Sequence, residues 1–364
     1  MAHLDSLLLR MMENGASDLH VVVGQKPKYR VHGAVTPIDD CPVLDEEMTR
    51  EWLFEICSKE QQDRYIEKKD FDFAYGIGEK ARYRVNYFFQ RTGFGAVFRI
   101  IPFEIATIEQ LNLPPVLKKL GEFRGGLVLV TGPTGSGKST TLAAIIDMIN
   151  KTQRRHIVTI EDPIEFVHRN IKSIVTHREI GEHTKDFASA LRGVFRQDAD
   201  VVLVGEMRDL ETIALALSAA ATGTLVYGTL HTNSAAKTID RIIDVFPSDQ
   251  QEQIRIMLSE SIKAIVAQQL LRKKDGKGRF AVNEILLGSP ALSNLIREGK
   301  IESIINVIQS GKAQGMQTMD EGIEKLLKQG VVDVADAYVK SIDKRRFEHY
   351  LPKDSAETVQ AGGH

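Results

Sequence analysis

The chain has 364 residues, 43% of them hydrophobic, which is enough apolar material for the cores of two domains. Its 47 Lys and Arg against 49 Asp and Glu leave a formal charge of −2, which argues against nucleic acid as a partner. Cys41 and Cys57 are too few for a disulfide framework or a four-cysteine zinc site. The N terminus has no signal-peptide pattern and no apolar run approaches the ~18 residues of a membrane span. We therefore expect a cytoplasmic protein with no direct membrane insertion.

The first hundred residues combine helical and strand patterns. Leucines at helical spacing over residues 4–11, stopped by Asn14-Gly15, predict an opening helix. The further predicted elements are strands over 18–23, 29–35, 71–75, 81–89 and 95–101, and a helix over 46–59. We expect a separate α+β domain over residues 1–101, followed by a proline-containing linker over 102–115.

From residue 116 onward, short apolar runs alternate with helical patterns, which predicts an α/β domain with a mostly parallel sheet covered on both faces. The apolar runs are 127–130, 156–160, 201–204 and 224–227. Each ends in a polar cluster, and ligands of such sheets bind outside the carboxyl ends of the strands. After Phe246 the pattern predicts helices, including an amphipathic segment over 253–271. A basic turn over 273–279 and more helices complete the domain at residue 350, and the polar end, 351–364, is predicted to be disordered.

The first polar cluster is a glycine-rich loop between an apolar strand and an amphipathic helix. It reads Gly132-Pro133-Thr134-Gly135-Ser136-Gly137-Lys138-Ser139-Thr140 and matches G-x-x-x-x-G-K-[ST]. Glycines let backbone N–H groups close around a phosphate, and the helix N terminus favours negative charge. Lys138 supplies a positive charge, and Ser139 offers a hydroxyl ligand to Mg²⁺. The alternative is a chance glycine turn, but strand, loop and helix follow in the order that the motif requires, so we predict ATP and Mg²⁺ as ligands.

The second cluster, Glu161-Asp162-Pro163-Ile164-Glu165, follows the 156–160 run directly. Pro163 takes the chain out of regular pairing and leaves carboxylates at the strand tip. Glu161, Asp162 and Glu165 are therefore candidates to orient Mg²⁺ or the attacking water. The alternative is an ordinary acidic loop.

The next two clusters contain a glutamate and a histidine. Glu206 follows Gly205, where P-loop ATPases usually place an Asp before the catalytic Glu, so Glu206 is predicted to polarise water while the metal's carboxylate comes from residues 161–165. His231 lies between Thr229 and Asn233 and is a candidate to contact the γ-phosphate. The alternatives are a helix N-terminal charge for Glu206 and a structural role for His231.

Together these clusters resemble the Walker A, Asp box, Walker B and His box of the secretion ATPases. The similar segments are 132–140, 159–165, 205–209 and 229–234, and the likeness extends from Ala16-Ser17-Asp18-Leu19-His20 to Gly315-Met316-Gln317-Thr318-Met319-Asp320. Within that family the chain resembles the retraction motors of type IV pili, which produce twitching motility. The resemblance implies a PAS-like domain over 1–101, a RecA-like ATPase domain over 116–350, and a homohexamer with ATP bound between subunits. It also implies an inner-membrane platform protein as partner and a peripheral location at the inner membrane.

Two arginines match the family's arginine-bearing strands, in Arg84-Val85-Asn86 and Val97-Phe98-Arg99. An arginine from a neighbouring subunit can neutralise charge on the transferred phosphoryl group. We expect Arg99, and less surely Arg84, to act in this way. The alternative is that both form local ion pairs on the surface.

One segment departs from the family pattern. The family sequence Ala-Ile-Arg-Asn-Leu-Ile-Arg, tied by the resemblance to retraction output, reads Ala291-Leu292-Ser293-Asn294-Leu295-Ile296-Arg297 here. An accessory retraction paralogue is therefore one alternative. A pilus-extension or type II secretion ATPase normally has an extra N-terminal region and a four-cysteine zinc insertion, which this chain cannot build. A scaffold that binds ATP without hydrolysing it is disfavoured by Glu161 and Glu206.

Overall fold

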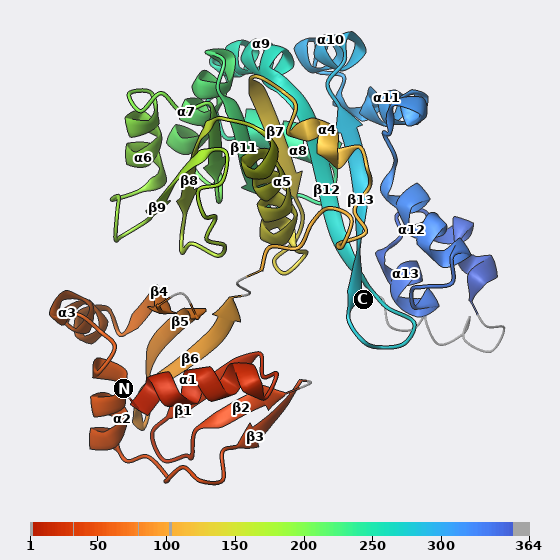
Figure 1. The fold of residues 1–364 in the computed structure, drawn as a ribbon. Helices are drawn as coiled ribbons and strands as arrows, with labels where there is room; N and C mark the ends of the chain where they lie inside the picture. The colour runs from red at the N-terminus through yellow and green to blue at the C-terminus, as the bar shows by residue number, and fades with distance from the viewer. Residues whose placement is uncertain (1–2, 32, 79, 102–103, 352–364) are drawn as a thin grey trace. The chain divides into compact units, whose positions relative to one another are not determined.

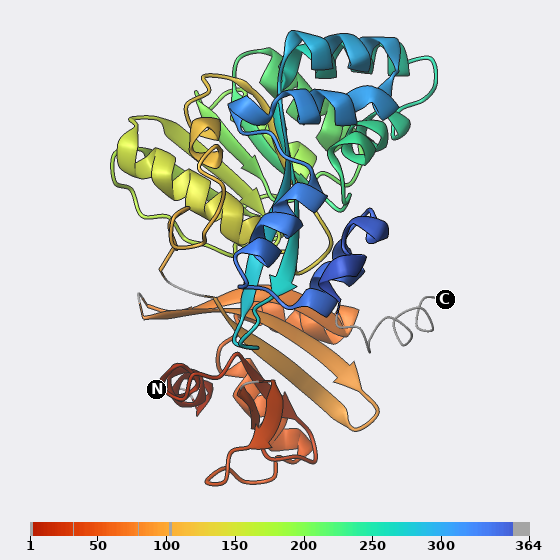
Figure 2. The ribbon, with the colours of Figure 1, turned by 90° about the vertical axis from the view of Figure 1, so that its right-hand side faces the viewer.

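The computed structural model describes residues 3–31, 33–78, 80–101 and 104–351 (Figures 1 and 2). The predictions for residues 352–364, and for residues 102 and 103 of the linker, lie outside the described residues. The chain divides into two compact units. Unit 1 comprises residues 1–104 with 163–167, and unit 2 comprises residues 105–162 with 168–364.

Unit 1 is built on an antiparallel six-stranded sheet in the order β3-β2-β1-β6-β5-β4. Its strands are β1 (Asp18–Val22), β2 (Lys28–Val31), β3 (Ala34–Pro37), β4 (Asp70–Ile77), β5 (Ala81–Gln90) and β6 (Gly93–Ile101). Its helices are α1 (His3–Glu13), α2 (Glu46–Phe54) and α3 (Lys59–Lys68). Leucines of α1 and aromatic residues of the sheet form the core. Buried Tyr83 donates a hydrogen bond to the Leu8 carbonyl at 2.6 Å, so its hydroxyl is paired inside that core.

Two predicted elements of unit 1 are wrong. Residues 29–35 form a hairpin of β2 and β3 rather than one strand, and Gly33 in the turn has φ +88°, a conformation that suits glycine. The helix predicted over 46–59 ends at Phe54. A second helix, α3, starts after Ser58 because Ser58 and Gln61 form a reciprocal capping box.

Unit 2 contains a seven-stranded sheet in the order β13-β12-β7-β11-β10-β8-β9, in which β13 alone is antiparallel to its neighbour. The strands are β7 (Gly126–Thr131), β8 (His156–Glu161), β9 (Ile174–Glu179), β10 (Val201–Val204), β11 (Leu225–Leu230), β12 (Ile262–Arg272) and β13 (Arg279–Leu287). This sheet confirms the predicted α/β fold class. Its central strands β7, β10 and β11 are buried along their whole length because both faces are covered.

Helices cover the two faces of this sheet in separate layers (Figure 1). The helices are α4 (Leu117–Leu120), α5 (Lys138–Thr152), α6 (Phe187–Val194), α7 (Leu210–Ala221), α8 (Ala235–Asp244), α9 (Gln251–Ser261), α10 (Pro290–Glu298), α11 (Ile304–Ser310), α12 (Met319–Lys328) and α13 (Val334–Lys340). Short 3₁₀ turns lie at Ile301–Ser303, Lys312–Gln314, Lys344–Arg346 and Glu348–Tyr350. Val201 and Leu203 of β10 pack in the core with α4 and α5, while Val202 and Val204 pack in the core with α6 to α11. Helices α12 and α13 form a smaller core against the β12–β13 hairpin.

The predicted amphipathic helix over 253–271 is also wrong. Helix α9 ends at Ser261, and the next eleven residues form strand β12, paired with β7 and β13. Residues 262–267 are apolar or β-branched except Lys263, which favours a buried strand. The basic turn predicted over 273–279 therefore connects two strands, and β13 stands where helices were expected.

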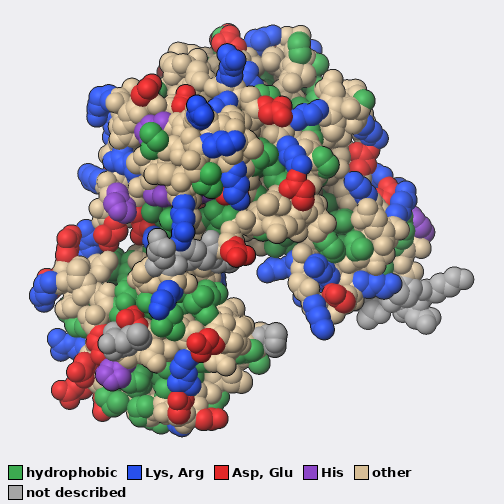
Figure 3. Space-filling view, in the orientation of Figure 1, with side chains coloured by type: hydrophobic (Ala, Val, Ile, Leu, Met, Phe, Trp, Pro, Cys, Tyr) green, Lys and Arg blue, Asp and Glu red, His purple; other side chains and the backbone are tan. Residues whose placement is uncertain are grey.

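No helix in the part of the chain that the structure describes is long and apolar enough to cross a bilayer. Basic and acidic side chains are interspersed on the face drawn in Figure 3.

Candidate functional site

The glycine-rich loop joins β7 to α5, and its backbone conformation requires glycine. Gly132, Gly135 and Gly137 have φ of +145°, +76° and +83°. A Cβ on Gly132 would lie 2.2 Å from the carbonyl oxygen of Gln268, so no other residue fits there. Residues 133–135 are exposed, and a Cβ on Gly135 would meet no atom within 4 Å, so this part of the loop faces open space.

Lys138 is the first residue of α5, and its ammonium turns back onto the loop. The Nζ atom donates hydrogen bonds to the carbonyl oxygens of Gly132 at 2.9 Å and Pro133 at 3.2 Å. Among the described residues, no side chain caps the N terminus of this fifteen-residue helix. Its first-turn amides, with the half-buried Ser139 and Thr140, therefore suit phosphate oxygens and the hydroxyl ligand of a Mg²⁺ ion.

Glu206 follows β10 and is half-buried. His231, just past β11, places its Nε2 atom 2.8 Å from Glu206 Oε1, and the Arg208 guanidinium contacts the same oxygen. Burial opposes ionisation of Glu206, but the hydrogen bonds and charges of Arg208 and His231 outweigh it and hold the pKa of the carboxyl below its ordinary value. The structure thus brings together Glu206 and His231, which the sequence predicts as separate candidates. It adds Arg208, whose pKa is raised by Glu206 first and also by the charge of Asp162.

Contacts between β10 and β11 hold the Glu206 backbone. The Thr229 hydroxyl donates a hydrogen bond to the Gly205 carbonyl, and the Met207 amide donates to the Thr229 carbonyl at 3.0 Å. A Cβ on Gly228 would lie 2.3 Å from Met207 Sδ, so the Met207 side chain occupies the space that this glycine leaves on β11.

Strand order sets the distances between the predicted groups. Strands β7, β11, β10 and β8 are neighbours in parallel register, so the phosphate loop, His231, Glu206 and Glu161 follow their carboxyl ends at one edge of the sheet. At about 4.8 Å per strand spacing, the end of β8 lies roughly 14 Å from the end of β7. Buried Glu161 is therefore farther from the loop than Glu206, which is only two spacings away.

The three carboxylates predicted to orient Mg²⁺ are divided between the two units. Glu161 and Asp162 belong to unit 2, whereas Glu165 lies in the 163–167 segment of unit 1, where its Oε1 atom is 3.6 Å from Arg84 Nη1. Within the described ranges, no set of three or more His, Cys, Asp or Glu side chains is placed to hold a metal ion.

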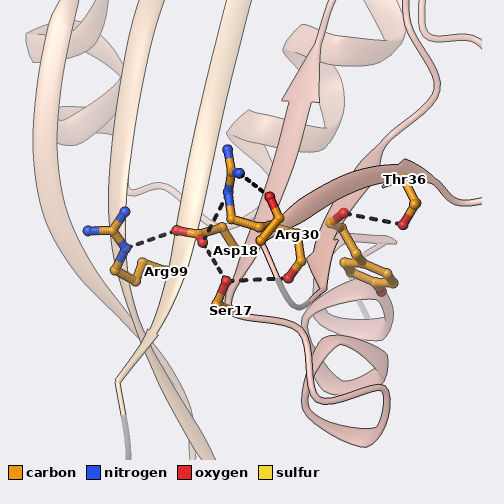
Figure 4. Close-up of polar contacts among 7 residues, drawn as sticks. Ser17, Asp18, Arg30, Thr36 and Arg99 are labelled. Carbon is orange, nitrogen blue, oxygen red and sulfur yellow. Dashed lines mark hydrogen bonds and ion pairs between the residues drawn. The ribbon is translucent and has the colours of Figure 1, made fainter. Parts of the chain in front are cut away.

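Arg99 of β6 is bound by a buried aspartate on the neighbouring strand (Figure 4). Its Nε atom donates to Asp18 Oδ1 at 2.9 Å, while Arg30 Nε lies 3.7 Å from Oδ2 and the Ser17 hydroxyl donates to Oδ2 at 2.7 Å. Burial would raise the pKa of Asp18, but the hydrogen bonds from Ser17 and Arg99 lower it below its usual value. The Arg99 side chain is 69% exposed, so its charged end remains in solvent.

Gln268, buried under the phosphate loop, belongs to the site although the sequence patterns do not identify it. The helical interpretation of residues 253–271 hides it, because a polar residue is unremarkable on an amphipathic helix. In a strand of buried apolar residues the same glutamine is conspicuous, since buried amides need partners.

Comparison with known proteins identifies the family. A model of the type II/IV secretion system protein family matches residues 1–339. The chain is 48% identical over 338 residues to the type IV pilus retraction ATPase PilT of Pseudomonas aeruginosa, and the aligned region covers 93% of this chain and 98% of that protein. It is 51% identical over 306 residues to a twitching motility protein of Neisseria gonorrhoeae, covering 84% and 82% of the two chains. A crystal structure of the pilus retraction motor PilT with bound ADP matches with a TM-score of 0.89 and 44% identity, over 96% of this chain and 99% of that one. The chain therefore belongs to the type II/IV secretion system protein family and is one of its P-loop ATPases.

Proposed function

We propose that this protein hydrolyses ATP as a homohexameric motor that drives the retraction of type IV pili. The observation that carries the proposal is the glycine loop at the same sheet edge as the Glu206–His231 pair. Similarity to named pilus retraction ATPases over both units supports retraction as the output. The motor would work in the cytoplasm, at the inner membrane, against a platform protein of the pilus machinery.

The candidate residues of unit 2 have distinct parts in this proposal. The loop amides and Lys138 bind the β- and γ-phosphates, so the ammonium exchanges the loop carbonyls for phosphate oxygens. Ser139, and Glu161 or Asp162 through water, would hold Mg²⁺, which neutralises phosphate charge when bound. Glu206, whose lowered pKa keeps it ionised at neutral pH despite its partial burial, orients water and accepts a proton from it. His231 holds Glu206 Oε1 and faces the γ-phosphate.

The first test is phosphate release by the purified protein. Lys138→Ala should reduce ATP turnover to background, because water cannot replace a point charge on the β- and γ-phosphates. Lys151→Ala, near the other end of the same helix, where the exposed Lys151 pairs with Asp147, is the matched control and should keep normal turnover. Normal turnover of Lys138→Ala would remove the phosphate loop from the mechanism.

The direction of movement is tested in cells. Deleting the gene of a retraction motor should give immobile cells with surface pili, whereas deleting an extension motor should give cells without pili. Cells that lose their pili would contradict the proposal.

Ser293 favours one alternative, an accessory retraction ATPase. Its hydroxyl donates a hydrogen bond to the Ser259 carbonyl of α9 at 2.7 Å, a contact that the family's arginine at this position could not make in the same way. Expressing this protein alone in a strain that lacks its own retraction ATPases distinguishes a principal motor from an accessory one. A principal motor restores twitching by itself, and an accessory one restores it only together with another retraction ATPase.

A further inference from the structure

We infer that Gln268 is a positioning residue for nucleotide binding, because its side chain and its backbone together hold the phosphate loop in its binding conformation. This inference rests on the proposed ATP-binding role of the loop. Gln268 lies on β12, next to β7 in the sheet, and its side chain is 1% exposed. It is far from the loop in sequence and touches it in the fold.

The side-chain amide of Gln268 connects three elements. Its Nε2 atom donates to the Ser136 carbonyl in the loop at 2.7 Å. Its Oε1 atom accepts hydrogen bonds from the Thr141 hydroxyl in the first turn of α5 at 2.8 Å and from Asn283 Nδ2 on β13 at 2.9 Å. Asn283 is itself held, because Gln317 Nε2 donates to the backbone carbonyl of Asn283 at 2.7 Å.

The backbone of Gln268 limits the loop from the same side. Its carbonyl oxygen would lie 2.2 Å from a Cβ on Gly132, and its Nε2 atom would lie 3.1 Å from a Cβ on Gly137. Two of the three glycines with positive φ in the loop therefore pack directly against Gln268. The loop cannot change its path at either end without breaking these contacts.

The polar contacts are costly to lose because they are buried. Ser136, Thr141, Gln268 and Asn283 are each no more than 2% exposed, so water cannot replace a missing partner. A loop whose Ser136 carbonyl has lost its donor would turn toward solvent, and its amides would no longer converge on a phosphate. The loss would affect binding of ATP and ADP alike, because both use the same amides.

The experiment compares nucleotide affinity and turnover in Gln268→Met, which keeps the length of the side chain but removes both polar atoms. We expect ADP binding to weaken about ten-fold, in keeping with the loss of a buried hydrogen bond. KM for ATP should rise by a similar factor while kcat changes less, because the lost interaction serves substrate and transition state equally. Gln269→Met, on the next and partly exposed residue of β12, is the matched control and should bind ADP like the wild type.

Gln268→Glu gives a second readout that depends on pH. A protonated glutamic acid can donate to the Ser136 carbonyl, whereas the carboxylate cannot and also repels phosphate. Burial raises the pKa of a carboxyl group, so this variant should titrate near neutral pH. Its ADP affinity should approach the wild-type value at pH 6 and fall several-fold more steeply than the wild type by pH 8.

These measurements test the proposed function and the role of Gln268 separately. If the wild type binds no ADP, the proposed function fails. If the wild type binds ADP and Gln268→Met binds within two-fold of it, or if Gln269→Met loses as much affinity, the inference about Gln268 is wrong. Should Gln268→Met not fold, Gln268→Glu decides, because a pH dependence parallel to the wild type would overturn the inference.

Discussion

At the scale of single residues, two basic side chains contact the same oxygen of the Glu206 carboxylate and determine its protonation. Arg208 and His231 both contact Oε1, and together they lower the pKa of the carboxyl despite its partial burial. The group is therefore ionised throughout the neutral pH range. An ionised carboxylate can accept a proton from water without first losing one itself, as its proposed role requires.

Glu206→Gln should keep ATP affinity and lose turnover. The amide retains the shape and the contact with His231, but it cannot accept a proton, so we expect kcat to fall by about 10² to 10⁴. Glu211→Gln is the control, because Glu211 is exposed, pairs with Arg192 and lies at the start of α7 beyond the site. Nucleotide binding and phosphate release should be measured on both. A collapse of affinity with turnover intact would make Glu206 a binding residue and move the search for the base to Glu161 or Glu165.

At the scale of secondary-structure elements, the sequence predicted an element correctly where its residues meet one local requirement. The phosphate loop could be predicted because its glycines and Lys138 serve one local purpose, and the apolar runs of β7, β8, β10 and β11 because both faces of these strands are buried. Strand β12 could not be predicted in this way, because its polar residues Lys263 and Gln268 interrupt the apolar run. Gln268 donates a hydrogen bond to Ser136, which lies more than a hundred residues away in the sequence. A pattern of neighbouring residues cannot reveal a contact of this kind.

Edge strand β9 pairs with β8 along its whole length, and two histidines lie next to this pairing. Their protonation should matter for stability. His177 on β9 hydrogen-bonds Thr159 on β8 at 2.8 Å, and its ring stacks on His168 with centroids 5.9 Å apart. Burial, helped by the nearby charges of His177 and Lys151, lowers the pKa of His168 to about 3. In the unfolded chain this histidine has a pKa near 6.5.

The sign of the pH effect follows from these two pKa values. Above pH 6.5 His168 is neutral in both states, and its full contribution to stability is present. Below pH 6.5 the unfolded chain binds a proton that the folded state excludes, so the free energy of unfolding falls by about 1.4 kcal/mol per pH unit until about pH 3. His168→Phe should remove this loss. Thermal midpoints between pH 7.5 and 5 should therefore fall less in the variant than in the wild type, and parallel curves would contradict the assignment.

At the scale of the whole molecule, the two units hold different parts of the proposed machinery. The phosphate loop, Glu206 and His231 belong to unit 2, while Arg84 and Arg99 belong to unit 1. Both arginines form ion pairs within unit 1, with Glu165 and Asp18, but their side chains are 42% and 69% exposed. The Arg84–Glu165 pair is exposed on both sides and contributes under about 1 kcal/mol, and most of the Arg99 side chain is exposed although its partner Asp18 is buried. A phosphate of a neighbouring subunit could therefore compete for either guanidinium. Hydrolysis in one subunit would then depend on unit 1 of the next.

Mixed rings test this dependence directly. Arg99→Ala and Lys138→Ala subunits should each be inactive alone, because an arginine from a neighbour is worth roughly 10³ to 10⁵ in rate where such residues act. In a mixed ring, some sites combine an intact Lys138 with an intact Arg99 from the adjacent subunit, so phosphate release should reappear on mixing. Lys138→Ala mixed with Glu206→Gln is the control and should stay inactive, since both residues serve the same subunit's site and every site then lacks one of them. If size exclusion of differently tagged subunits establishes mixed rings and no activity returns at any ratio, Arg99 acts within its own subunit or stays paired with Asp18.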